Sequence, residues 1–167
     1  MPVLRTIVGV MGGGLASEAV SADARETGRL IAENGWVLLT GGRDCGVMAE
    51  ASRGAAEAGG LVIGILPDDT SEGVAPHVDI AIPTGMGDAR NAINVLASHV
   101  VVALPGGAGT ASEVALALKA DRPVVALGFP IGAPFERYYA SGRLVDAATP
   151  ADAIAIVTSF LAEQDRS

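Results

Sequence analysis

The chain alternates short apolar runs with longer segments in which alanine is mixed with charged residues. The apolar runs contain few polar positions, which is typical of strands buried on both faces of a sheet. They cover residues 6–12, 36–42, 61–67, 78–84, 99–107 and 122–128. Segments with helical periodicity lie between and after them, at 17–33, 46–58, 87–98, 110–120 and 150–163. Alternating strands and helices predict an α/β fold, a Rossmann-like doubly wound parallel sheet with helices on both faces.

Length and composition limit the class of protein. With 167 residues, the chain suits a single domain over 1–167. A net charge of −8 and the lack of any lysine or arginine run argue against a nucleic acid partner. No stretch approaches the roughly 18 apolar residues of a membrane helix, and the apolar N-terminal run is short and broken by glycine. We therefore expect a cytoplasmic protein with no membrane partner. The single cysteine, Cys45, excludes an internal disulfide and is expected in the core or in a turn.

Glycine is concentrated at three junctions between a predicted strand and a predicted helix: "GVMGGGLAS" (9–17), "TGGRDCGVM" (40–48) and "PGGAGTASE" (105–113). In a parallel sheet these turns open on one edge, at the carboxyl ends of the strands. Unpaired N–H groups at a helix start bind phosphate, and glycine lets the phosphate approach them. Each turn alone is also explained as a tight connection. The three turns together predict a cradle for a phosphate and a ribose.

Several named motifs are absent. No lysine follows the glycines, which argues against a P-loop nucleoside triphosphatase. Gly12-x-Gly14 is followed by Ser17, and the second strand ends in Thr40-Gly41-Gly42 instead of an acid, which argues against NAD. His77 and His99 form no metal-ligand spacing with Cys45 or an acid, so we expect no metal and no cofactor.

Two charged residues beside these turns have both a structural and a functional interpretation. Thr110 and Glu113 fit a capping box, in which Glu113 reaches back to the N–H of Thr110. Arg90 falls in the first turn of a predicted helix, where it either lies on a solvated face or pairs with Asp88, a candidate N-cap. Alternatively, Arg90 and Glu113 act on a ligand held by the glycine-rich turns.

The sequence resembles the Lonely Guy family, which is also labelled "lysine decarboxylase-like". "PGGAGTASE" matches the family's P-G-G-x-G-T-x-x-E motif, and "GGRDCGVM" is similar to its G-G-G-x-x-G-L-M turn. The resemblance covers nearly the whole chain. It implies a Rossmann-like homodimer that binds nucleotides, some members of which hydrolyse the N-glycosidic bond of nucleoside 5′-monophosphates. Lysine decarboxylation fits poorly, since Lys119 is the only lysine and no pyridoxal-binding lysine stands out.

Carried over by position, the resemblance implies that Arg90 and Glu113 are catalytic. A carboxylate stabilises the positive charge that develops on the ribose or orients water, while arginine fixes the phosphate or the leaving base. The family motifs and the first glycine-rich turn together give the expected ligand-binding residues: Gly12, Gly13, Gly14, Ser17, Gly41, Gly42, Gly46, Met48, Asn91, Pro105, Gly106, Gly107, Gly109 and Thr110.

Two differences from the family's sequence pattern favour an alternative function. Cytokinin-activating members carry M-H-x-R-K, whereas this chain has one more residue before Arg90, no histidine, and Asn91 in place of lysine. Arg43 stands where the third glycine of the other turn is expected. "Ala89-Arg90-Asn91" is similar to a branch of small proteins that includes a molybdenum cofactor carrier. We therefore expect the protein to bind a nucleotide or a similar phosphorylated small molecule at the glycine-rich turns. It either hydrolyses nucleoside 5′-monophosphates, or it carries a phosphorylated pterin such as the molybdenum cofactor without catalysis.

Assembly of at least two copies is expected from the resemblance and from two helices. The predicted helices at 46–58 and 87–98 are apolar and rich in alanine, with little polar face to show water. We expect a homodimer or a higher homo-oligomer.

Overall fold

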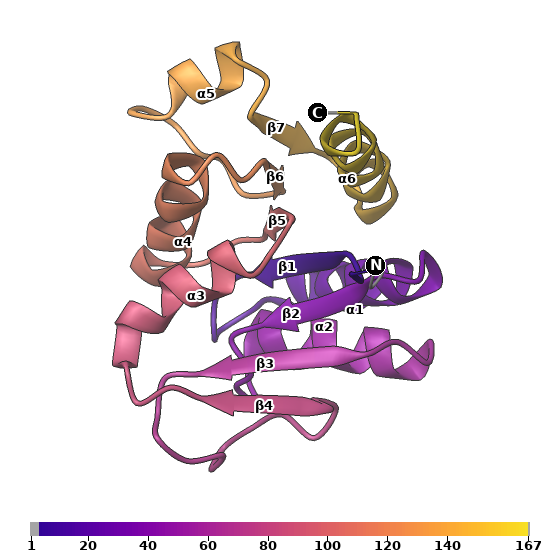
Figure 1. The fold of residues 1–167 in the computed structure, drawn as a ribbon, viewed down its shortest axis with the longest axis vertical. Helices are drawn as coiled ribbons and strands as arrows, with labels where there is room; N and C mark the ends of the chain where they lie inside the picture. The colour runs from indigo at the N-terminus through magenta and orange to yellow at the C-terminus, as the bar shows by residue number, and fades with distance from the viewer. Residues whose placement is uncertain (1–3, 167) are drawn as a thin grey trace.

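A seven-stranded parallel sheet forms the centre of the computed structural model, which describes residues 4–166 (Figure 1). Its strand order is β4-β3-β2-β1-β5-β6-β7. The strands are β1 (Ile7–Met11), β2 (Val37–Thr40), β3 (Val62–Leu66), β4 (Ile80–Pro83), β5 (Val100–Ala103), β6 (Val124–Leu127) and β7 (Leu144–Ala147). The order reverses between β1 and β5, and in such sheets ligands bind outside the carboxyl ends of the strands at that reversal.

Helices cover both faces of the sheet, which confirms the predicted Rossmann-like α/β fold. One face packs against α1 (Glu18–Glu33), α2 (Gly46–Glu57) and α6 (Pro150–Gln164). The other packs against α3 (Asn91–Leu96), α4 (Ala108–Lys119) and the short α5 (Glu136–Ala140). In Figure 1, β5 and β6 lie between α4 on the left and α6 on the right. None of the helices within residues 4–166 has the length and hydropathy needed to cross a bilayer.

The two helices of the first face pack at very close range. A Cβ atom added to Gly28 of α1 would lie 2.0 Å from the backbone oxygen of Ala51 in α2. A Cβ atom added to Gly54 of α2 would lie 1.9 Å from the backbone oxygen of Arg25. Glycine is therefore required at both positions if the helix axes are to keep this separation.

Several details of the predicted secondary structure were wrong. The expectation that every strand is buried fails for β4, where Ile80 and Ile82 are 44% and 41% exposed, because β4 is an edge strand. The helix predicted at 87–98 is split into a 3-10 turn, η1 (Gly87–Arg90), and α3. The predicted elements also omit α5 and β7, and α4 begins at Ala108, two residues before its predicted start.

Candidate functional site

The three glycine-rich turns meet at the carboxyl edge of the sheet, as predicted. The N–H of Gly13 donates to the carbonyl oxygen of Pro105 at 3.0 Å, and the N–H of Val47 donates to the carbonyl oxygen of Gly13 at 3.0 Å. These contacts need small residues. A Cβ atom on Gly46 would lie 2.1 Å from the oxygen of Gly13, and one on Gly106 would lie 2.8 Å from the Gly13 nitrogen.

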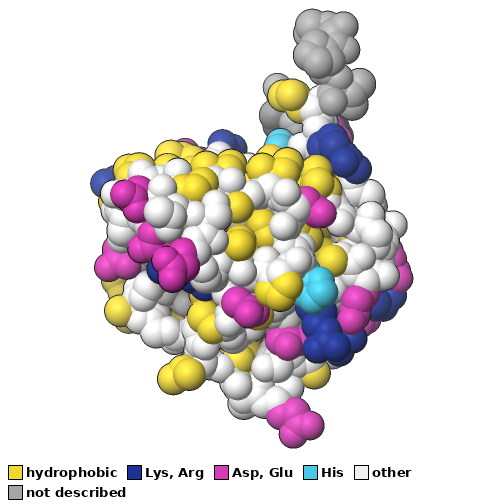
Figure 2. Space-filling model, turned by 90° about the horizontal axis from the view of Figure 1, so that it is seen from below, with side chains coloured by type: hydrophobic (Ala, Val, Ile, Leu, Met, Phe, Trp, Pro, Cys, Tyr) yellow, Lys and Arg dark blue, Asp and Glu magenta, His cyan; other side chains and the backbone are white. Residues whose placement is uncertain are grey.

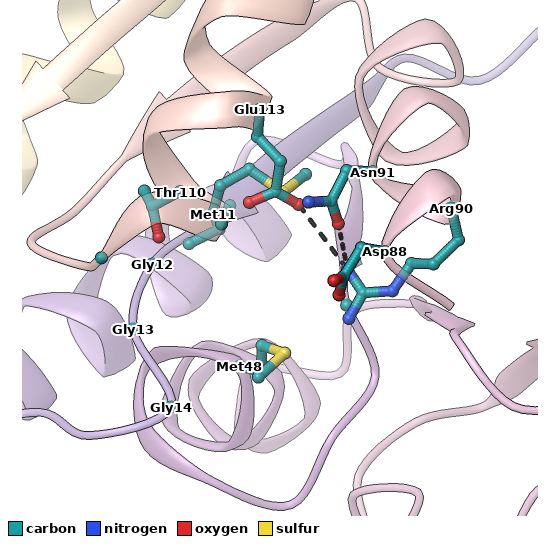
Figure 3. Close-up of a pocket in the computed structure, with 14 residues that line it drawn as sticks. Met11, Gly12, Gly13, Gly14, Met48, Asp88, Arg90, Asn91, Thr110 and Glu113 are labelled. Carbon is teal, nitrogen blue, oxygen red and sulfur yellow. Dashed lines mark hydrogen bonds and ion pairs between the residues drawn. The ribbon is translucent and has the colours of Figure 1, made fainter. Parts of the chain in front are cut away.

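A cavity of about 210 Å³ opens where these turns meet η1 and α4 (Figure 3). Its lining includes eleven of the residues expected from the sequence: Gly12, Gly13, Gly14, Gly41, Met48, Arg90, Asn91, Gly107, Gly109, Thr110 and Glu113. Figure 3 shows Glu113 reaching from α4 toward the cavity, with Arg90 approaching from the side where Asp88 and Asn91 also lie. The structure thus brings segments from four parts of the chain to one pocket.

Five of the expected ligand residues lie outside this cavity. Ser17 caps α1, where its hydroxyl accepts from the N–H of Val20. Pro105 and Gly106 line a neighbouring hollow on the α1 side, together with Ser17. Gly42, at φ 77°, packs against β3, and Gly46, at φ 51°, begins α2. These residues shape the turns from behind the cavity.

The N-terminus of α4 points at the cavity and carries no side-chain cap. Gly107 is the N-cap residue, and Gly107, Gly109 and Thr110 line the pocket. The predicted capping box is therefore wrong, because Thr110 lies inside the helix and Glu113 bonds elsewhere. The first N–H groups of a helix have no intrahelical partner, and at α4 they are available to an anion such as phosphate.

Arg90 and Glu113 form a buried ion pair across the pocket. Nη1 of Arg90 lies 3.7 Å from Oε1 of Glu113, and the two side chains are 13% and 8% exposed. The same Nη1 donates to Oδ1 of Asn91 at 2.9 Å. The expectations that Arg90 lies on a solvated face or that Asp88 caps a helix are therefore wrong. Asp88 makes no side-chain cap and instead lines the cavity.

Burial changes the ionisation of both partners. Burial raises the pKa of the Glu113 carboxyl to about 6, against the opposing effects of its hydrogen bond from Asn94 and of the nearby Arg90 charge. Burial also lowers the pKa of Arg90, and the charge of Glu113 opposes this shift. The carboxyl with this raised pKa lines the cavity, where a ligand can reach it.

Arg43 is held away from the cavity lining by the loop after β3. Its guanidinium pairs with the carboxylate of Asp68 and donates to the carbonyl oxygen of Glu72 at 3.4 Å. The residue that replaces the family's third glycine thus ties the β2–α2 turn to the 67–79 loop. Cys45 is an exposed N-cap residue of α2, which fits the predicted turn position and not the core.

Sequence reasoning missed some residues of the site. Val10, Met11 and Asp88 line the cavity, and Asn94 holds Glu113 through a 2.7 Å hydrogen bond. Val10 and Met11 directly precede Gly12 at the end of β1, so position alone could have indicated them. Asn94 lies four residues after Arg90, the spacing at which two helical side chains share a face. No group of three His, Cys, Asp or Glu side chains within residues 4–166 is placed to hold a metal ion.

The fold and the pocket together define a Rossmann-like protein whose cavity lies at the reversal of the strand order, the place where ligands bind in sheets of this kind. The model of the SLOG cluster4 family matches residues 5–154, and the chain belongs to this family. This match and the structures below support the superfamily indicated by the sequence motifs, including its branch of molybdenum cofactor carriers.

Two solved structures resemble this chain over nearly its whole length. The molybdenum cofactor binding protein from the phototrophic bacterium Rippkaea orientalis is 46% identical, with 96% of this chain and 99% of that chain covered and a TM-score of 0.87. The Moco carrier protein from Chlamydomonas reinhardtii is 48% identical, with the same coverage and a TM-score of 0.87. In addition, an uncharacterised protein of Archaeoglobus fulgidus is 44% identical over 124 residues, which are 74% of this chain and 81% of that protein.

Proposed function

We propose that the protein binds a phosphorylated pterin such as the molybdenum cofactor in the cavity and carries it without cleaving it. The observation that carries this proposal is the uncapped N-terminus of α4, which opens on the same pocket as the buried Arg90–Glu113 pair. The similarity to molybdenum cofactor binding and carrier proteins over 96% of the chain supports the choice of ligand.

Each part of the pocket has a role in this proposal. The N–H groups at Gly107, Gly109 and Thr110 hold the phosphate, because they are unpaired donors at the positive end of a helix dipole. Arg90 adds a fixed positive charge, and Met11 and Met48 provide polarisable apolar contacts for a ring. The glycines keep Cβ atoms out of the space that the ligand occupies.

A second candidate function, hydrolysis of nucleoside 5′-monophosphates, is favoured by the carboxyl of Glu113. Ionised Glu113 orients a water molecule toward C1′ of the ribose. The bond between C1′ and the base nitrogen breaks, water supplies the new hydroxyl, and the base leaves with a proton while Arg90 holds the phosphate. This candidate requires that Glu113 act on the ligand.

The two functions differ in whether a free base appears. We expect no base release when the protein is incubated with a panel of purine and pyrimidine nucleoside 5′-monophosphates and the products are separated by chromatography. Glu113→Ala serves as the matched control. Base release by the wild type that is lost in Glu113→Ala would establish the hydrolase and overturn carriage without cleavage.

We also propose a homo-oligomer that buries the exposed apolar side chains of β4 and α3. Ile80, Ile82 and Leu96 are 44%, 41% and 55% exposed. Seen from the β4 side, hydrophobic side chains form a band along the upper margin of the surface (Figure 2). The expectation that α2 contributes an apolar face is wrong, because Glu57 of α2 pairs with Arg25 and Arg53.

Light scattering at micromolar concentration tests this assembly. We expect at least a dimer for the wild type and a smaller species for Ile82→Glu, because a charge at this position opposes burial of the strand face. Thr70→Glu, on an exposed loop, is the control for the added charge. A monomeric wild type would contradict the proposal.

A further inference from the structure

Asn94 of α3 is a buried polar side chain whose position is not explained by packing. The residue is fully buried, and its Nδ2 donates to Oε1 of Glu113 at 2.7 Å. Its Oδ1 has no hydrogen-bond partner within residues 4–166. A buried amide oxygen without a partner is costly, and an apolar residue of the same size avoids that cost. We therefore attribute the presence of an amide at this position to its hydrogen bond with Glu113.

The hydrogen bond fixes the orientation of the Glu113 carboxyl. Oε1 accepts from Asn94 and faces Nη1 of Arg90 at 3.7 Å. Oε2 makes no hydrogen bond to the described residues, and Glu113 lines the cavity. A parallel contact one turn earlier, from Nδ2 of Asn91 to Oγ of Ser112 at 3.0 Å, holds α3 against α4. One carboxyl oxygen is thus held while the other is left to a ligand.

The charged groups around Glu113 come from one wall of the pocket. Arg90 and Asp88, both of η1, are the other charged side chains among the residues that line it. Arg43 and Asp68 lie farther out and act on the charge of Arg90. The parts of β1, α2 and α4 that line the cavity bring no further charge besides Glu113 itself. The group closest to the Glu113 carboxyl is therefore the uncharged amide of Asn94, at 2.7 Å, and not the guanidinium of Arg90, at 3.7 Å.

We propose that Asn94 is a positioning residue that holds Glu113 by one oxygen, in both protonation states, and turns the other oxygen toward the ligand. When Glu113 is ionised, Nδ2 of Asn94 donates to it. When Glu113 is protonated, a half-turn of the amide lets Oδ1 accept the proton of the acid. An amide offers both interactions from one side chain, because it has a donor N–H and an acceptor oxygen.

The free oxygen of Glu113 affects how a ligand binds, an inference that rests on the proposed function. Ionised Oε2 accepts hydrogen bonds from N–H groups, such as those on the aminopyrimidine edge of a pterin ring. Protonation removes the negative charge and weakens this contact. Burial raises the pKa of Glu113 to about 6, so binding should strengthen as pH rises through this value.

Titration of Glu113 in the ligand-free protein tests the positioning role. The carboxyl carbon of ¹³C-labelled glutamate would be followed by NMR from pH 4 to 9 in the wild type, Asn94→Leu and Asn94→Ser. We expect the midpoint to rise by about one pH unit or more in Asn94→Leu, because the hydrogen bond lost by the ionised carboxylate is stronger than the one lost by the neutral acid. Asn94→Ser introduces a hydroxyl that can still donate, on a smaller side chain. Its midpoint should lie between those of the wild type and Asn94→Leu. Equal midpoints in all three proteins would overturn the proposal.

Binding of molybdopterin at several pH values connects this titration to the ligand. The phosphate of the ligand also titrates near pH 6, so Glu113→Gln gives the pH dependence of the ligand alone. The difference between the wild type and Glu113→Gln gives the pH dependence of affinity that is due to Glu113. We expect the midpoint of this Glu113-dependent part to lie at higher pH in Asn94→Leu, by the same amount as the midpoint measured by NMR. Binding with no such shift would overturn the link between Asn94 and the ligand. A wild type that binds no molybdopterin would overturn the proposed function while the NMR result still decides the role of Asn94.

Discussion

Replacement of Gly28 with alanine is expected to destabilise the protein by about 3 kcal/mol, at the upper end of what overpacking costs. The added Cβ would lie 2.0 Å from the backbone oxygen of Ala51 and 2.8 Å from its carbonyl carbon. Both are backbone atoms of α2, so relief requires the two helices to move apart. The better helix propensity of alanine, worth up to about 1 kcal/mol, offsets only part of this cost. Urea unfolding followed by circular dichroism measures the difference in the free energy of unfolding.

Gly109→Ala is the matched control for this substitution. Gly109 also lies in a helix, but a Cβ added there has no atom within 4 Å outside its own local helix backbone. We therefore expect Gly109→Ala to be as stable as the wild type or slightly more stable, because alanine favours the helix. If Gly28→Ala unfolds at the same urea concentration as Gly109→Ala, the close packing of α1 on α2 does not require glycine at position 28.

Loss of the Arg90 charge is expected to weaken ligand binding by about 10- to 100-fold, the range for a lost hydrogen bond to a charged group. Arg90→Met keeps a flexible apolar stem in this largely buried position while it removes the guanidinium. The remaining Glu113 carboxylate then faces an anionic ligand without its nearest cation, which adds to the loss. Calorimetric titration with molybdopterin at pH 8 measures the change in affinity.

Arg137→Met provides the control for this measurement. Arg137 is exposed on α5, where it stacks on the ring of Tyr138. Its substitution changes the net charge of the protein by the same amount and should leave the affinity within about twofold, because Arg137 does not line the cavity and its exposed charge is screened by salt. Equal affinities of the Arg90→Met variant and the wild type would place the ligand away from Arg90.

Much of the fold could be predicted from the sequence because buried parallel strands are apolar nearly throughout. The same rule failed where burial is incomplete. The edge strand β4 looks like its buried neighbours, although Ile80 and Ile82 are partly exposed. The strand β7 escaped notice because the exposed Asp146 interrupts its apolar residues. Periodicity reports the apolar character of a segment and not its place in the sheet.

The site shows a similar limit. Glycine-rich turns after three strands predicted the shared edge, since the connection rules of parallel sheets fix where such turns meet. The interpretation of Glu113 as a cap was wrong because the local spacing from Thr110 satisfies the capping motif, whereas a contact with Asn94, nineteen positions earlier in the chain, decides the conformation. A long-range side-chain contact of this kind leaves no periodic signal in a single sequence.

The central claim is that the cavity binds a phosphorylated pterin and releases it unchanged. The most direct measurement is a calorimetric titration of the wild-type protein with molybdopterin at pH 8, followed by recovery of the ligand and mass spectrometry. We predict saturable binding, with the ligand recovered intact and AMP bound more weakly. Clear binding of AMP with no binding of molybdopterin would contradict the account.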